Sequence, residues 1–155
     1  PAEDMAAMYN ACDYTINISD AEGFGLSALE SLSCGVPVIV TMTGGLQEQV
    51  TDGKDWFGYG IQPASRSIIG SLQVPYIYED RISKEDFIST LKKALNLSPK
   101  AYKNLSKKGL KHVEENYNFQ TYKKRWIEIM DNLIEEHGSW SERKNYTRWH
   151  LMEVA

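Results

Sequence analysis

Two carboxylates, Glu22 and Glu30, lie eight positions apart around a glycine-containing turn, and they are the residues of this chain best suited to chemistry. A carboxylate accepts hydrogen bonds from neighbouring hydroxyls, so it is suited to holding a polyol such as a sugar or a ribose. Gly23 and Gly25 let the backbone turn sharply and leave its N–H groups uncovered. The pattern predicts a site that combines carboxylates with backbone donors.

The elements around this turn are predicted to form a βαβ unit. Residues 14–18 and 36–40 are rich in β-branched side chains and lack a polar face, so both are predicted as buried parallel strands. A helix is predicted over residues 26–33, with Gly35 just past its end. Ligands of open parallel sheets lie outside the carboxyl ends of the strands, where the helix N-terminus points. The turn is therefore predicted to lie at a ligand rim.

A set of sequence blocks in order resembles the donor-binding domain of retaining GT-B glycosyltransferases of the glycosyltransferase family 4 type. The blocks are Met8 to Tyr14, Glu22-x7-Glu30 with Gly23-Phe24-Gly25 inside it, Cys34 to Val38, and Gly44 to Glu48. The resemblance covers residues 5–53 closely and residues 85–133 more loosely. It implies an α/β fold, the C-terminal half of a Rossmann-like donor-binding domain with a parallel sheet, flanking helices and a helical C-terminal tail.

The resemblance also implies a role for each residue of the site. Glu22 is expected to contact donor-sugar hydroxyls near the reacting carbon, and Glu30 to bind the ribose hydroxyls. The backbone of the remaining residues is expected to hold the sugar and the diphosphate, and these residues are Gly23, Phe24, Gly25, Leu26, Gly44 and Gly45. The donor is expected to be a UDP- or GDP-sugar, with no metal and no other cofactor. Whether Glu22 acts covalently stays open.

Simpler interpretations exist for the same residues. Ser27 and Glu30 match a capping box, in which Glu30 would serve only its own helix. Glu22 also fits a solvated turn residue, and Gly44 with Gly45 fits an ordinary loop after a strand. The joint occurrence of the blocks favours the site.

Composition indicates a globular protein that does not bind nucleic acid. The 155 residues are 42% hydrophobic and 25% charged, and the net charge of −4 gives no overall positive field. Cys12 and Cys34 fall on predicted buried elements and are expected to be reduced. No apolar run approaches the roughly 20 residues of a membrane span. A cytoplasmic location is expected, and the lysines spaced along residues 100–111 are interpreted as a solvated face, with peripheral membrane contact as the alternative.

The predicted organisation is one partial domain and a tail. Residues 1–137 are predicted to form the partial nucleotide-sugar-binding domain, with an insert at about residues 64–80 that is too apolar for a flexible linker and packs as an added hairpin or edge strand. Residues 138–155 are predicted to form a helical tail that packs on an absent N-terminal acceptor-binding domain of the same polypeptide. The chain is therefore expected to be a piece of a longer protein and inactive alone.

The expected function is the donor-side part of a retaining hexosyltransferase that moves a sugar to a glycan, lipid or other hydroxyl acceptor. One alternative is a non-catalytic interaction lobe. Another is a different nucleotide-sugar enzyme of the same architecture, such as an epimerase. The sequence leaves the sugar, the nucleobase, the acceptor and the oligomeric state undetermined.

Overall fold

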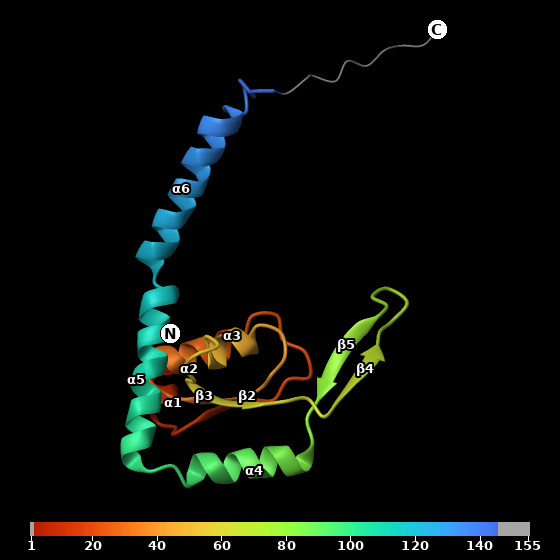
Figure 1. The fold of residues 1–155 in the computed structure, drawn as a ribbon, viewed down its shortest axis with the longest axis vertical. Coiled ribbons are helices and arrows are strands. Elements are labelled where there is room, and N and C mark those ends of the chain that lie inside the picture. The colour runs from red at the N-terminus through yellow and green to blue at the C-terminus, as the bar shows by residue number, and fades with distance from the viewer. Residues whose placement is uncertain (1, 146–155) are drawn as a thin grey trace. The chain divides into compact units, whose positions relative to one another are not determined.

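The computed structural model describes residues 2–145, and the chain divides into two compact units, residues 1–115 and 116–155 (Figure 1). The elements up to that boundary, in chain order, are α1 (Ala2–Asn10), β1 (Thr15–Asn17), α2 (Leu26–Ser33), β2 (Val38–Thr41), α3 (Leu46–Val50), β3 (Gly58–Ile61), β4 (Ser65–Ile69), β5 (Ile77–Arg81), α4 (Lys84–Leu95) and α5 (Pro99–Asn116). The second unit contains α6 (Phe119–His137).

The first unit is built on a three-stranded parallel sheet with the order β1-β2-β3. Thr15 pairs with Val38 and Val38 pairs with Gly58, so the three strands run together in one direction. Their carboxyl ends therefore share one edge of the sheet. The segment that follows β1 contains Glu22, and the segment that follows β2 contains Gly44 and Gly45.

Helices cover both faces of this sheet, as Figure 1 shows for α2 and α3 on one side and α4 on the other. One core cluster joins α2, α3 and β2 through Leu32, Leu46 and Val40. The other joins β2, β3 and α4 through Ile39, Ile61 and Ala94. Every residue of β2 is buried, as expected for a central parallel strand. The predicted α/β fold with flanking helices is confirmed.

The predicted burial of residues 14–18 is wrong in part, because Ile16 is 45% exposed and Ile18 is also exposed. Ile16 pairs with Ile39, so the two side chains lie on the same face of the sheet. Helix α4 packs on this face, but its contacts are mainly with β3, which is separated from β1 by β2. Helix α4 therefore covers mainly the β3 side of this face, and beside β1 it accepts a hydrogen bond from the Tyr14 hydroxyl to the carbonyl of Ala94 at 3.0 Å. Cys12 is likewise exposed rather than buried, and both cysteines are free thiols.

Capping hydrogen bonds fix the starts of three helices. The Ser83 hydroxyl accepts from the N–H of Asp86 at 3.0 Å at the start of α4. The Ser98 hydroxyl accepts from the N–H of Ala101 at 3.3 Å before α5. Asn118 accepts from the N–H of Thr121 at 2.8 Å before α6. Each cap satisfies a backbone donor that has no partner inside its own helix.

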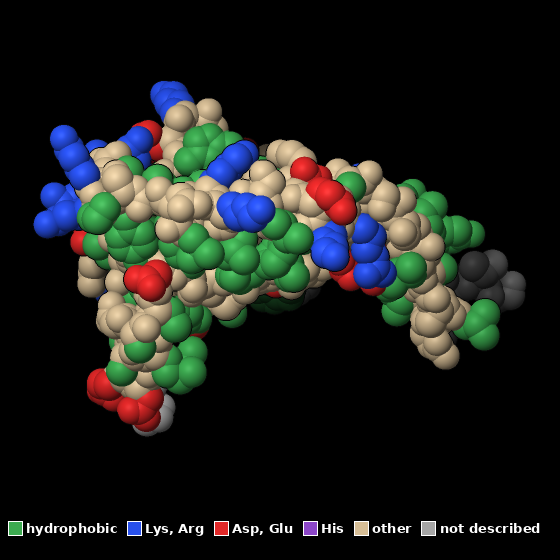
Figure 2. All heavy atoms as spheres, turned by 90° about the horizontal axis from the view of Figure 1, so that it is seen from below, with side chains coloured by type: hydrophobic (Ala, Val, Ile, Leu, Met, Phe, Trp, Pro, Cys, Tyr) green, Lys and Arg blue, Asp and Glu red, His purple; other side chains and the backbone are tan. Residues whose placement is uncertain are grey.

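Residues 65–81 form an antiparallel hairpin from β4 and β5, which is one of the two forms that the sequence left open. Ser65 pairs with Arg81 at its base and Ile69 pairs with Ile77 toward its tip. Hydrophobic side chains gather at its projecting end, on the right of Figure 2.

The second unit presents α6, an amphipathic helix on which large apolar side chains such as Trp126 and Leu133 are about half exposed. Among residues 2–145, no helix is long and apolar enough to cross a membrane. The part of the predicted tail helix that carries Tyr146, Trp149, Leu151 and Met152 lies outside the described residues.

Candidate functional site

The turn before α2 depends on Gly25. Gly25 is the N-cap of α2 and has φ +88°, in the left-handed region that favours glycine. A Cβ on Gly25 would also lie 2.8 Å from Cδ2 of Leu46 in α3. The left-handed backbone and the close packing of α3 therefore both require glycine at this position.

Gly44 and Gly45 pack directly against the backbone of the same turn. A Cβ on Gly44 would lie 1.7 Å from the carbonyl oxygen of Glu22, and one on Gly45 would lie 2.4 Å from that of Phe24. The N–H of Gly45 donates a hydrogen bond to the carbonyl of Gly23 at 3.2 Å. The loop after β2 thus fixes the position of residues 22–25. This close approach is possible because Gly44 and Gly45 lack side chains.

The Glu22 carboxylate is half-buried, and polar groups hold it from two sides. The side-chain amide of Asn17, at the carboxyl end of β1, donates to Oε2 of Glu22 at 3.4 Å and lies 3.3 Å from the hydroxyl of Ser27. The N–H of Gly23 donates to Oε1 of Glu22 at 3.1 Å. Oδ1 of Asn17 accepts from the N–H and the hydroxyl of Ser19, which fixes the orientation of its amide. Glu22 is therefore positioned by the end of the strand that precedes it.

The Glu30 carboxylate is exposed and belongs to the second turn of α2. Its Oε2 accepts a hydrogen bond from the hydroxyl of Tyr9 in α1 at 2.9 Å. Partial burial, and then this bond to a carboxylate, raise the pKa of Tyr9 to about 12. Ser27 lies within α2 rather than at its N-cap, so the capping-box interpretation of Glu30 does not apply.

The first backbone hydrogen bonds of α2 run from the N–H groups of Ala28 and Leu29 to the carbonyl of Gly25. The N–H groups of Gly25, Leu26 and Ser27 precede these bonds and lie at the positive end of the helix dipole. A negative group placed there is favoured, as a diphosphate would be. The N–H of Gly23, by contrast, donates to Glu22.

The hairpin is attached to the segment just before Glu22. The N–H of Asp80 donates to the carbonyl of Asp20 at 2.7 Å, and the guanidinium of Arg81 pairs with the Asp20 carboxylate at 2.5 Å. Arg66 pairs with Asp80 at 2.7 Å and, together with a bond from Thr43, lowers the pKa of that carboxyl group. The base of the hairpin is thus bound two positions before Glu22 in the chain.

Sequence reasoning missed Asn17, Tyr9 and Asp20 as members of the site. Asn17 carried a usable signal, because a polar residue at the carboxyl end of a predicted buried strand lies where ligands bind in such sheets. Tyr9 carried none, since its contact with Glu30 joins residues 21 positions apart. Asp20 is identified only by the hairpin that reaches it.

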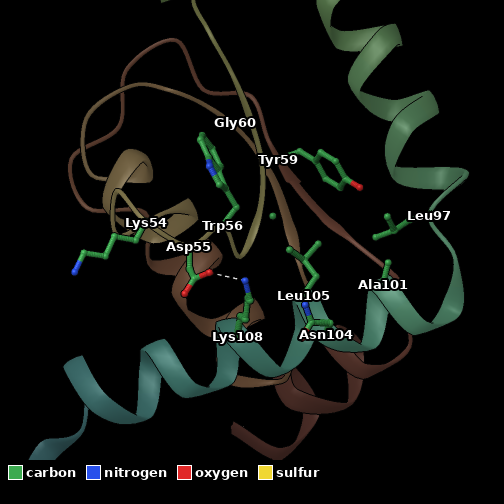
Figure 3. Close-up of a pocket in the computed structure, with 11 residues that line it drawn as sticks. Lys54, Asp55, Trp56, Tyr59, Gly60, Leu97, Ala101, Asn104, Leu105 and Lys108 are labelled. Carbon is green, nitrogen blue, oxygen red and sulfur yellow. Dashed lines mark hydrogen bonds and ion pairs between the residues drawn. The ribbon is translucent and has the colours of Figure 1, made fainter.

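A cavity of about 500 Å³ lies elsewhere in the first unit, between β3 and α5 (Figure 3). Trp56 and Leu105 line it, and the carboxylate of Asp55 pairs with the ammonium of Lys108 at its rim. None of the predicted site residues lines this cavity. Within residues 2–145 there is no cluster of three or more His, Cys, Asp or Glu side chains that could hold a metal ion.

The chain is similar in sequence to known proteins. Residues 1–112 match the family described as glycosyl transferases group 1. A D-inositol 3-phosphate glycosyltransferase of Streptosporangium roseum is 47% identical over 53 residues, which are 34% of this chain and 12% of that protein. An enzyme of the same name from Corynebacterium jeikeium is 46% identical over 54 residues, 35% of this chain and 13% of its own.

A sucrose-phosphate synthase from Thermosynechococcus elongatus has a similar structure, with a TM-score of 0.65 and 23% identity. The likeness covers 86% of this chain and 28% of the synthase, and it shows a shared fold. The matched part of this chain thus spans only a small share of each of these proteins. Because the family match covers most of the chain, the prediction from the sequence blocks is confirmed, and the chain belongs to the group 1 glycosyl transferases.

Proposed function

We propose that the polypeptide containing this chain transfers a hexose from a nucleotide-diphosphate sugar to a hydroxyl acceptor with retention of configuration, and that this chain is its donor-binding part. Family membership supports glycosyl transfer. The sequence relatives named above are D-inositol 3-phosphate glycosyltransferases, which also supports glycosyl transfer. The proposed donor is a UDP- or GDP-sugar. No metal or other cofactor enters the proposal.

One observation carries this proposal. Two carboxylates flank the N-terminus of α2 at the carboxyl edge of the sheet, and each accepts a hydrogen bond from a polar side chain of another element, Asn17 for Glu22 and Tyr9 for Glu30. Such preorganised carboxylates suit a ligand rich in hydroxyl groups, and the helix N-terminus between them suits a phosphate. A nucleotide sugar has both kinds of group.

The proposed chemistry uses these groups in turn. The bond between the anomeric carbon and the diphosphate oxygen breaks, and its electrons leave with the nucleoside diphosphate. The N–H groups at the start of α2 stabilise the negative charge that develops there. Glu22 stabilises the positive charge that develops on the sugar ring, while Glu30 holds the ribose. The acceptor oxygen forms the new bond to the anomeric carbon on the face that the diphosphate leaves, and its proton passes to the departing diphosphate oxygen.

The test is Glu22→Gln in the full-length protein, which keeps the shape of the side chain and removes its charge. We expect the turnover number to fall by roughly a hundredfold or more, the usual scale for losing one transition-state electrostatic contact. Glu48→Gln makes the same change on the exposed surface of α3 and is the control, with transfer unchanged. Circular dichroism checks that both variants fold. Normal transfer by a folded Glu22→Gln variant would remove the assigned role.

A further inference from the structure

The hairpin of β4 and β5 separates charged from uncharged residues along its length. Residues 67–78 contain no Asp, Glu, Lys or Arg, whereas Arg66, Glu79, Asp80 and Arg81 lie together at the base. These four charged side chains pair with one another or with Asp20. The base is therefore ion-paired and the far end is uncharged.

The uncharged end is apolar on both faces. In the antiparallel register Ile68 is opposite Tyr78, and Ile69 is opposite Ile77. Side chains alternate between the faces of a strand, so these two pairs lie on opposite faces. All four side chains are exposed. A protein that packed against one face of this ribbon would leave the other apolar pair in water.

The loop at the tip continues the apolar surface. Leu72 is 99% exposed, and Val74 and Tyr76 are exposed beside it. Figure 2 shows hydrophobic side chains gathered at the projecting end, beyond a group of charged side chains. Because this end of the hairpin is apolar on both faces and at its tip, it is suited to burial in an apolar medium that surrounds it, rather than to contact with a flat protein surface. Tyr76 and Tyr78 add the amphipathic rings that favour a membrane interface.

We infer that the tip of the hairpin, residues 68–78, inserts into the interface of a lipid bilayer. Because the charges at its base are paired with one another or with Asp20, insertion depends on apolar burial and not on attraction to anionic lipid. The base is bound to Asp20, two positions before Glu22, so insertion holds the candidate site at the membrane surface. One consequence is that the acceptor is itself carried on a lipid. This consequence rests on the proposed function, whereas the membrane contact does not.

The test is binding of the full-length protein to vesicles of phosphatidylcholine alone and of phosphatidylcholine mixed with phosphatidylglycerol, measured by co-sedimentation. We expect similar binding to both compositions and little change when salt is raised. Leu72→Glu is expected to lower the partition coefficient roughly tenfold or more, because it places a charge at the tip. The matched control is Leu95→Glu on α4, where the leucine is 69% exposed, and its binding is expected to equal that of the wild type.

Several results would overturn the inference. These are no binding to either vesicle, binding that disappears in high salt, or equal losses in Leu72→Glu and Leu95→Glu. Loss of self-association in Leu72→Glu without vesicle binding would instead assign the tip to contact between copies. Titration of the same variants with nucleotide sugars distinguishes failure of this inference from failure of the proposed function. Leu72 does not belong to the donor site, so donor binding should not change in Leu72→Glu.

Discussion

At the scale of single residues, Glu30 shows what the sequence can and cannot predict. Its type and its spacing from Glu22 identified it as a ligand-binding candidate. Its partner Tyr9 could not be identified in this way, because a hydrogen bond between α1 and α2 depends on how the two helices pack. The same holds for Asn17, whose position at a strand end was visible but whose contacts with Glu22 and Ser27 were not.

The contact between Tyr9 and Glu30 can be measured through the ionisation of Tyr9. Its pKa is raised to about 12 by partial burial and by the Glu30 carboxylate, both of which disfavour the phenolate. We expect the tyrosine absorbance titration of the wild type minus that of Tyr9→Phe to show a transition near pH 12. In Glu30→Gln the transition of Tyr9 should move to lower pH. A transition that stays in place in that variant would show that Glu30 does not act on Tyr9.

At the scale of elements, local signals predicted the helices well. Ser83, Ser98 and Asn118 are of residue types that favour helix N-caps, and each accepts the capping bond. Burial of the edge strand β1 was not predicted correctly, because it depends on how far α4 extends over the sheet. The form of the insert also stayed open, since pairing of β4 with β5 depends on long-range register.

The close packing of the loop after β2 against the turn before α2 leads to a prediction about glycine. Gly44→Ala places a Cβ against the carbonyl of Glu22, and we expect a loss of about 3 kcal/mol in the free energy of unfolding, typical of severe overpacking. Gly23→Ala is the control, because nothing lies within 4 Å of its added Cβ. Urea denaturation of both variants measures the difference. Equal stabilities would mean that the two loops do not pack as described.

At the scale of the whole molecule, His112 links the stability of the first unit to pH. Its ring is buried and stacks on Phe57 with ring centroids 4.2 Å apart. Burial lowers the pKa of His112 because it disfavours the charged imidazolium. The unfolded chain then binds more protons than the folded chain at mildly acidic pH. Stability is therefore complete above the unfolded pKa of about 6.5 and falls as the pH drops below it.

The direction of this pH dependence of stability can be checked with the variant His112→Asn. We expect the urea midpoint of the wild type to fall between about pH 7 and about pH 5, and the fall to be smaller in the variant, which lacks the titrating ring. Comparing the two proteins at each pH removes the contribution of the carboxyl groups they share. An equal fall in both proteins would show that His112 does not carry the effect.

The central claim is that this chain supplies the donor site of a group 1 glycosyl transferase. Calorimetric titration of the full-length protein with UDP-sugars and GDP-sugars, repeated with Glu30→Ala, tests it most directly. We predict that the wild type binds one of the two donor classes and that Glu30→Ala weakens binding roughly tenfold or more, as expected for a lost hydrogen bond to a charged group. If the full-length protein binds neither class, or if Glu30→Ala binds as tightly as the wild type, the assignment of this site is contradicted.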